Sequence, residues 1–234
     1  SVTELIAIRE RLDAELYEVQ NVDEQIARME KEIAFAKAES QKIAVQLHEK
    51  RAKALPKLKA SIEKILVELG MPNAQLPITL TSLKELVVNG QDGLEFLFSA
   101  NKGMDAKPLG KGASGGELSR VMLAIKAVLS RHKKLPTLIF DEIDTGVSGE
   151  VAVKMGAILK DMGNTMQLIS ITHLPQIAGQ GASHFKVFKT DEAEKTKTKI
   201  VSLSHDDRIV EIAAMLGGNN QTTAALEHAR NLLN

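Results

Sequence analysis

The stretch LPTLIFDEID, from Leu135 to Asp144, decides the fold of this chain. Its apolar and β-branched residues lead directly into two adjacent carboxylates, Asp141 and Glu142. A short continuous apolar run predicts a strand that is buried on both faces of a parallel sheet. Ligand sites in such sheets lie at the carboxyl ends of the strands. We therefore expect both carboxylates at a sheet edge that binds a ligand, although a strand followed by a polar turn would look the same.

The two carboxylates suit metal-assisted hydrolysis. Asp141 could hold Mg²⁺ through water, because this hard cation keeps much of its hydration shell. Glu142 could orient and deprotonate an attacking water. A Walker B strand followed by a catalytic glutamate has this pattern.

A helix start precedes this strand in the stretch ASGGELSR, residues 113–120. Ser114 and Glu117 have the spacing of a capping box. Gly115 and Gly116 would leave backbone N–H groups open to an anion. Each glycine also lowers helix stability, so a capped helix without a ligand would not need both. We expect this helix to end at the basic residues 131–134.

A second buried strand is expected after the first. Residues 145–149 form a short polar loop, residues 150–162 a helix, and residues 166–171 an apolar strand that ends at Thr172 and His173. A lone histidine is more often structural than catalytic. His173 would end a strand parallel to the first one, beside the same edge, and this position favours function.

The first 54 residues predict one long helix with a coiled-coil seam. Apolar residues recur every seven positions through about six heptads, and neither Gly nor Pro interrupts them. The two seam sets are Leu5, Leu12, Val19, Ile26, Ile33, Ser40 and Leu47, and Ile8, Glu15, Val22, Met29, Ala36, Ile43 and Lys50. About 50 residues would make an arm of roughly 75 Å. A long amphipathic helix packed on a globular body is the alternative.

The rest of the chain predicts further elements around these. Pro56 is expected to break or kink the helix, which resumes until Gly70 and Pro72. Residues 76–80 and 94–99 are expected to be strands, with turn signals at Asn89-Gly90 and Asp92-Gly93. A hairpin is expected over residues 185–188 and 199–203, and helices over 207–216 and 222–232. The division that follows is an arm, residues 1–54, and a globular part, residues 55–234.

The chain contains no Walker A loop. Residues 107–112, KPLGKG, look similar, but the pattern G-x-x-x-x-G-K-[ST] needs Gly where Asp105 stands and Ser or Thr where Gly112 stands. The first residue is Ser1, and it leads directly into the helical pattern. We therefore expect a fragment of a longer protein. The helix that pairs with the arm would come from a missing segment of that protein or from another molecule.

The composition narrows the classes of protein to which this chain can belong. The 234 residues have a formal net charge of zero, so charge gives no indication of nucleic acid or membrane. The chain has no cysteine, which excludes disulfides and thiolate metal sites and fits a reducing cytosol. No apolar run approaches the roughly 20 residues that span a bilayer. Aromatic residues make up 3%, too few for a stacking platform for single strands.

The order of these motifs is that of the C-terminal half of an ABC-type ATPase: signature, Walker B, D-loop and switch histidine. Their amino-acid sequences closely resemble those of the RecN family of bacterial DNA-repair proteins, which are relatives of the SMC proteins. The stretches are ASGGELSR (113–120), FDEIDTGVSG (140–149), THLPQIA (172–178) and EIAAMLGG (211–218). The resemblance covers about residues 50–234. It implies an α/β fold: the C-terminal lobe of an ABC-type head, with a parallel sheet flanked by helices and a long N-terminal coiled-coil helix.

The resemblance also implies roles for single residues. Asp141 would support Mg²⁺, Glu142 would activate water, and His173 would sense the γ-phosphate of ATP. The signature residues Ser114, Gly115, Gly116 and Glu117 would bind ATP held by an opposing head, and Asp144 would lie in the D-loop across that interface.

The partners implied by the resemblance are DNA, through double-strand-break repair and recombination, a second head, and an N-terminal lobe with Walker A. It further implies a cytoplasmic, nucleoid-associated protein without a membrane. Two alternatives stay open. A chromosome-organising SMC subunit would share the heptads, whereas a transporter ATPase subunit would have no reason to carry them.

Overall fold

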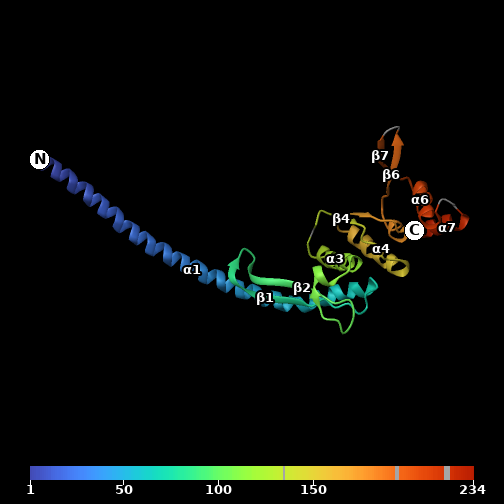
Figure 1. The fold of residues 1–234 in the computed structure, drawn as a ribbon, viewed down its shortest axis with the longest axis horizontal. Coiled ribbons are helices and arrows are strands. Elements are labelled where there is room, and N and C mark those ends of the chain that lie inside the picture. The colour runs from blue at the N-terminus through green and yellow to red at the C-terminus, as the bar shows by residue number, and fades with distance from the viewer. Residues whose placement is uncertain (134, 193–194, 219–221) are drawn as a thin grey trace. The chain divides into compact units, whose positions relative to one another are not determined.

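The computed structural model describes residues 1–133, 135–192, 195–218 and 222–234, and Figure 1 traces their elements in chain order. Lys134, part of the expected basic helix end, lies outside the described residues. The chain divides into two compact units. The first unit comprises residues 1–55 and 80–94, and the second comprises residues 56–79 and 95–234. The assignment of residues 1–54 as an arm and 55–234 as a head remains a prediction.

Helix α1 runs from Val2 to Glu68 with Pro56 inside it. The expected break at Pro56 does not occur, because the helix continues through this residue, and the alternative of a kink there remains a prediction. A proline inside a helix costs about 3 kcal/mol or more, because it removes one backbone N–H and crowds the preceding turn. The turns after Pro56 offset this cost, since Ile62, Ile65 and Leu66 are buried in the core of the second unit. Each such side chain contributes about 1.5–3 kcal/mol on burial.

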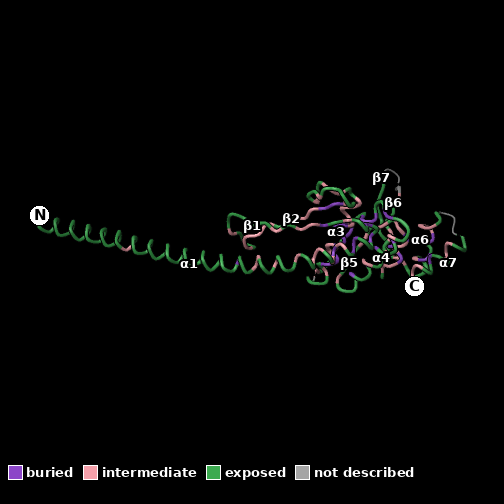
Figure 2. Tube along the Cα trace, turned by 90° about the horizontal axis from the view of Figure 1, so that it is seen from below, coloured by how far each residue is buried: buried purple, intermediate pink, exposed green. Residues whose placement is uncertain are grey.

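Most of the seam of α1 is exposed in the first unit, as Figure 2 shows by its green trace, although Leu47 near the hairpin is partly buried. Leu5, Leu12 and Ile33 are exposed by 68%, 51% and 66%. A row of large apolar side chains on an isolated helix is unusual unless another surface covers it. These exposed apolar side chains at heptad spacing are what predicts a partner helix.

The hairpin that follows is longer than expected. Strand β1 runs from Ile78 to Val87 and β2 from Gly90 to Phe98, so the turn has only two residues. Gly90, the first residue of β2, has a φ of +103°, which glycine adopts without strain. The second turn signal, Asp92-Gly93, lies inside β2. A short strand β3, Lys107–Pro108, pairs antiparallel with the end of β2.

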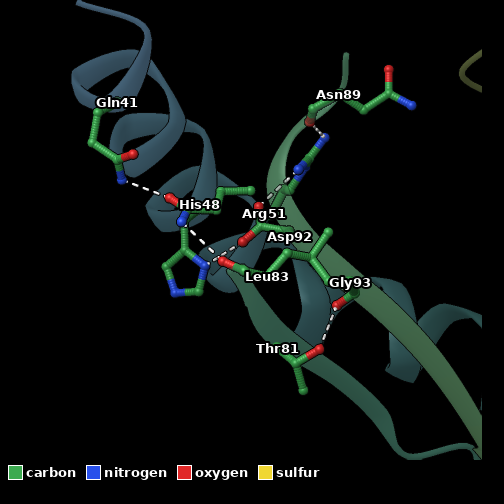
Figure 3. Close-up of polar contacts among 9 residues, drawn as sticks. Gln41, His48, Arg51, Thr81, Leu83, Asn89, Asp92 and Gly93 are labelled. Carbon is green, nitrogen blue, oxygen red and sulfur yellow. Dashed lines mark hydrogen bonds and ion pairs between the residues drawn. The ribbon is translucent and has the colours of Figure 1, made fainter. Parts of the chain in front are cut away.

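In the first unit, Asp92 ties the hairpin to α1 (Figure 3). Its side chain is 3% exposed. One carboxylate oxygen lies 2.6 Å from His48 Nδ1, and the other accepts a hydrogen bond of 2.7 Å from Arg51. Arg51 also donates to the backbone oxygen of Asn89, at 2.9 Å. The hydrogen bonds from His48 and then from Arg51 hold the pKa of the Asp92 carboxyl below its usual value near 3.8.

We expect the stability that this contact gives to the hairpin to depend on pH. A carboxyl whose pKa is lowered by folding adds stability above its usual pKa and loses it as the pH falls through the folded value. We expect Asp92→Asn to lower the hydrogen-exchange protection of β1 and β2 at pH 5–7. The deficit should shrink as the pH falls below about 3.8, where the carboxyl is protonated in the unfolded chain, and disappear once the pH passes the lower pKa of folded Asp92. Exposed Glu85 is the control: in Glu85→Gln any deficit should be small. A deficit for Asp92→Asn that is constant down to pH 2 contradicts the ionic role.

The second unit is built around two parallel strands, as expected. Strand β4 is Thr137–Asp141 and β5 is Gln167–Ile171, and their register pairs Asp141 with Ile171. Helices α3, Gly115–Ser130, and α4, Gly149–Gly163, supply much of the core beside them. Figure 2 shows the buried residues gathered around these two helices. The parallel sheet flanked by helices is thus confirmed.

The expectation that the Leu135–Asp144 strand is buried on both faces is wrong. Leu138 and Phe140 point to the core, whereas Ile139 is 65% exposed. Its neighbours on β5, Ile169 and Ile171, are 44% and 55% exposed. Side chains alternate along a strand, so these three residues share one face with Asp141. One face of the sheet is therefore apolar and open.

The remaining elements complete the second unit. Strands β6 and β7 form an antiparallel hairpin, and α6 and α7 pack around Ile212 and Ala229. The Walker A-like stretch 107–112 is divided between β3 and α2. The bounds are α2 Leu109–Gly112, α5 Pro175–Ala178, β6 Phe185–Glu192, β7 Lys195–Ser202, α6 His205–Gly217 and α7 Thr223–Leu233. Within the described part of the chain, no helix is long and apolar enough to cross a membrane.

Candidate functional site

The carboxyl ends of β4 and β5 form the candidate site. Asp141 and Ile171, the last residues of these strands, are register partners. Glu142 follows the first strand, and Thr172 and His173 follow the second. The structure therefore brings the predicted carboxylates and the predicted histidine to one sheet edge. Asp141 and Glu142 are exposed, and the His173 side chain is 72% exposed. The edge can accept an external group.

Glu142 has an unusual backbone. Its φ is +50°, and among the described residues it is the one non-glycine residue with a positive φ. This conformation costs roughly 1–2 kcal/mol for a residue with a Cβ. The turn is held by Thr145, whose hydroxyl and N–H both donate to the Glu142 backbone oxygen at 3.0 and 3.3 Å. Strained residues of this kind concentrate at functional sites.

The predicted capping box at the start of α3 is confirmed. The Ser114 hydroxyl accepts from the Glu117 N–H at 3.4 Å, and a Glu117 carboxylate oxygen accepts from the Ser114 N–H at 2.8 Å. The Ser114 hydroxyl also donates to that carboxylate at 2.8 Å. The backbone and then the side-chain hydrogen bond from Ser114 lower the pKa of the Glu117 carboxyl. These hydrogen bonds hold the helix start, and Ser114 itself is exposed.

The two signature glycines differ in their surroundings. A Cβ on Gly116 would lie 3.0 Å from the backbone oxygen of Thr145, so the loop after β4 packs against the start of α3. Gly116 thus has a structural reason to be glycine. A Cβ on Gly115 would meet no other atom within 4 Å in the described structure. Packing does not explain Gly115, and its N–H at the helix start is available to an anion.

Asp144 was expected at an interface with an opposing head, but it lies inside its own chain. Its side chain is fully buried, and one carboxylate oxygen accepts hydrogen bonds from the Thr172 hydroxyl and the His173 N–H. It is thus bonded within its own chain, and its predicted contact with an opposing head remains a proposal. Thr172, which bonds to Asp144, was not among the site residues predicted from the sequence. The available signal was a hydroxyl residue between the end of the strand and His173.

The edge fits Mg²⁺ held by few protein groups. Within the described ranges, no three His, Asp or Glu side chains are grouped as a metal cage would require. Mg²⁺ is commonly held by one or two carboxylates together with water and substrate phosphates, and exposed Asp141 can supply one of these. A hollow of about 480 Å³ in the second unit is lined by other residues, among them Lys59, Glu63 and Lys102. The candidate site is an open edge rather than an enclosed pocket.

Known proteins are similar to this chain over most of its length. No family model matches it. The DNA repair protein RecN of Haemophilus influenzae is 35% identical over 231 residues, which is 98% of this chain and 41% of that protein. The DNA repair protein RecN of Deinococcus radiodurans is 41% identical over 196 residues, or 84% of this chain and 34% of that protein. The chain thus spans about two fifths or less of the length of these curated relatives.

A solved structure agrees with this likeness. The Smc head domain with a coiled coil and joint from Pyrococcus yayanosii matches with a TM-score of 0.53 and 22% identity, over 69% of this chain and 29% of that one. At this identity, the likeness shows the fold alone. The chain is therefore similar to RecN proteins in sequence, and it shares the fold of an Smc head domain, with a long N-terminal helix.

Proposed function

We propose that the full-length protein carrying this chain is an SMC-like ATPase that acts in DNA double-strand-break repair and recombination. The observation that supports this most directly is the register of β4 and β5, which places Asp141 and Glu142 beside Thr172 and His173. A carboxylate that can support a metal and a base that can activate water are groups that serve phosphoryl transfer to water. The similarity to proteins named DNA repair protein RecN supports the DNA role.

Each residue has a distinct task in this proposal. Asp141 would hold Mg²⁺ through water at the end of β4. When bound, Mg²⁺ would neutralise charge on the phosphates. Glu142 accepts a proton from the attacking water, and its strained backbone fixes the direction of the carboxylate. His173 stands in solvent at the next strand end, where it can contact the γ-phosphate.

The signature residues act on a second head. Ser114, Gly115 and Gly116, supported by Glu117, bind the γ-phosphate of an ATP molecule that the opposing head holds. ATP therefore joins two heads, and its hydrolysis releases them. The exposure of Ser114 and Gly115 supports this arrangement, and a Cβ on Gly115 would meet no other atom within 4 Å in the described lobe.

The phosphate-binding loop comes from another segment. We propose an N-terminal lobe with Walker A that packs on the open sheet face formed by Ile139, Ile169 and Ile171. The greater length of the relatives leaves room for it. DNA is then the further partner, and a cytoplasmic, nucleoid-associated location follows from that role.

A chromosome-organising SMC subunit is the second candidate, because the Pyrococcus yayanosii Smc head shares the fold. The phenotype separates the two. A repair ATPase is needed after DNA breakage, whereas a chromosome-organising subunit is needed in undamaged cells. A transporter ATPase subunit has less support, because the long seam of α1 has no use in it.

We expect this chain alone to bind ATP weakly and not to hydrolyse it. Walker A loops cradle the phosphates with backbone N–H groups and a lysine, and the chain has no such sequence. Calorimetric titration and a phosphate-release assay on the purified chain and on the full-length protein provide the check. Turnover by the full-length protein alone supports the proposal. Micromolar affinity and turnover by the chain alone contradict the two-lobe site, and no turnover by either contradicts the ATPase function.

A further inference from the structure

A buried hydrogen-bond group joins the loop after β4 to the loop after β5. One Asp144 carboxylate oxygen, Oδ2, accepts from the Thr172 hydroxyl and, at 3.3 Å, from the His173 N–H. The Thr172 hydroxyl in turn accepts from the Leu174 N–H at 3.0 Å. Two consecutive backbone N–H groups of the second loop are therefore fixed by one Asp–Thr pair.

This group also determines where the His173 ring stands. Its Nδ1 lies 3.5 Å from Asp144 Oδ2, while the side chain as a whole is 72% exposed. The Nδ1 side of the ring thus faces the buried carboxylate, and the opposite side faces solvent. His173 follows the end of β5, and the paired end of β4 leads into Asp141 and Glu142.

Packing alone does not explain a carboxylate at this position. Asp144 is fully buried, and its second oxygen, Oδ1, has no hydrogen-bond partner among the described residues. A buried carboxylate with incomplete hydrogen bonding is costly, and an apolar side chain of similar volume would avoid that cost. The feature that the carboxylate adds is the directed contact with Thr172 and His173.

We propose that Asp144 and Thr172 are positioning residues. They hold the loop after β5, so that the His173 ring stands at the sheet edge that also carries Glu142. This inference rests on the proposed function, in which His173 contacts the γ-phosphate. Misplacement of a reacting group by about 1 Å can lower a rate by about 10²-fold. The loop after the Walker B strand and the loop with the histidine are thereby one structural unit.

The matched variants are Thr172→Val and Thr172→Ser in the full-length protein. Valine keeps the shape and removes the hydroxyl, whereas serine keeps the hydroxyl. We expect Thr172→Val to lower kcat by about 10- to 100-fold with the KM for ATP changed less than about threefold. Thr172→Ser should stay within about threefold of wild type. Thr172→Ala is a second variant without the hydroxyl and without added bulk, in case Thr172→Val does not fold.

Two further measurements separate positioning from a loss of stability. Amide hydrogen exchange at His173 and Leu174 should accelerate in Thr172→Val but not in Thr172→Ser, with α6 unchanged. In a His173→Ala background, Thr172→Val should lower kcat by less than about twofold, because its effect passes through the ring.

The outcomes distinguish the inference from the proposed function. If His173→Ala lowers kcat but Thr172→Val and Thr172→Ser behave alike, the inference is overturned and the proposed function stands. The inference is also overturned if Thr172→Val lowers kcat equally with and without the His173 ring. If His173→Ala keeps wild-type turnover, the proposed role of the histidine fails, and the inference fails with it.

Discussion

Glu142→Gln in the full-length protein is expected to lower ATP turnover by about 10²- to 10⁴-fold, the usual contribution of a positioned base. This corresponds to about 2.7–5.4 kcal/mol in the barrier. Glutamine keeps the shape of the side chain but cannot accept the proton of the attacking water. ATP binding should persist, because Asp141 still supports the metal. Heads joined by ATP should therefore accumulate as dimers, which sedimentation can measure beside phosphate release.

The control is Glu150→Gln. Glu150 is an exposed carboxylate in the first turn of α4, paired with Lys154 at 2.8 Å. Its replacement should leave turnover within about twofold, since exposed ion pairs contribute little. Unchanged turnover in Glu142→Gln would remove Glu142 from the catalytic role. Loss of ATP binding together with turnover would show that Glu142 supports the nucleotide rather than the water.

The local pattern of the sequence predicts the site because neighbouring residues determine it. The apolar run before Asp141 specifies a strand, and the similar run before Thr172 specifies its parallel neighbour. The spacing of Ser114 and Glu117 specifies the capped helix start. None of these features depends on distant parts of the chain. The fold class and the edge that carries the candidate residues could therefore be predicted.

Features set by tertiary packing could not be predicted in this way. Continuation of α1 through Pro56 depends on the burial of Ile62 and Leu66 in the second unit. The open sheet face at Ile139 depends on what covers it, which the apolar run alone does not specify. Burial of Asp144 depends on Thr172, which lies 28 residues away. Local sequence shows a carboxylate after a strand but not the hydroxyl that it meets.

The second large effect concerns Ser114→Arg. If Ser114 contacts the γ-phosphate held by an opposing head, arginine should fill that space and block hydrolysis, while ATP binding to the same head's own Walker A persists. Ser114 also caps α3, so the variant loses about 1 kcal/mol of helix stability. Thermal unfolding must therefore show that the variant is folded. Wild-type turnover would leave Ser114 as a helix cap only.

Mixing two inactive variants then tests which molecule completes each site. With Ser114 acting across a two-fold interface, a mixed dimer of Ser114→Arg and Glu142→Gln has one site with both lesions and one site that is intact. Random pairing makes about half of the dimers mixed, each with one good site of two. Turnover should therefore recover to about a quarter of wild type. If each site takes both residues from one head, the mixture stays inactive.

In a second mixture, the arrangement within one head gives the higher turnover, so the two mixtures together distinguish the two arrangements. A chain with both lesions is mixed with wild type, and chain exchange is established by co-purification of differently tagged chains. Across an interface, both sites of a mixed dimer are damaged, so only wild-type homodimers work and turnover is about a quarter. Within one head, the wild-type half of each mixed dimer still works and turnover is about a half. Values of a quarter in both mixtures support Ser114 acting across the interface, whereas zero and a half place Ser114 and Glu142 in the same site of one head.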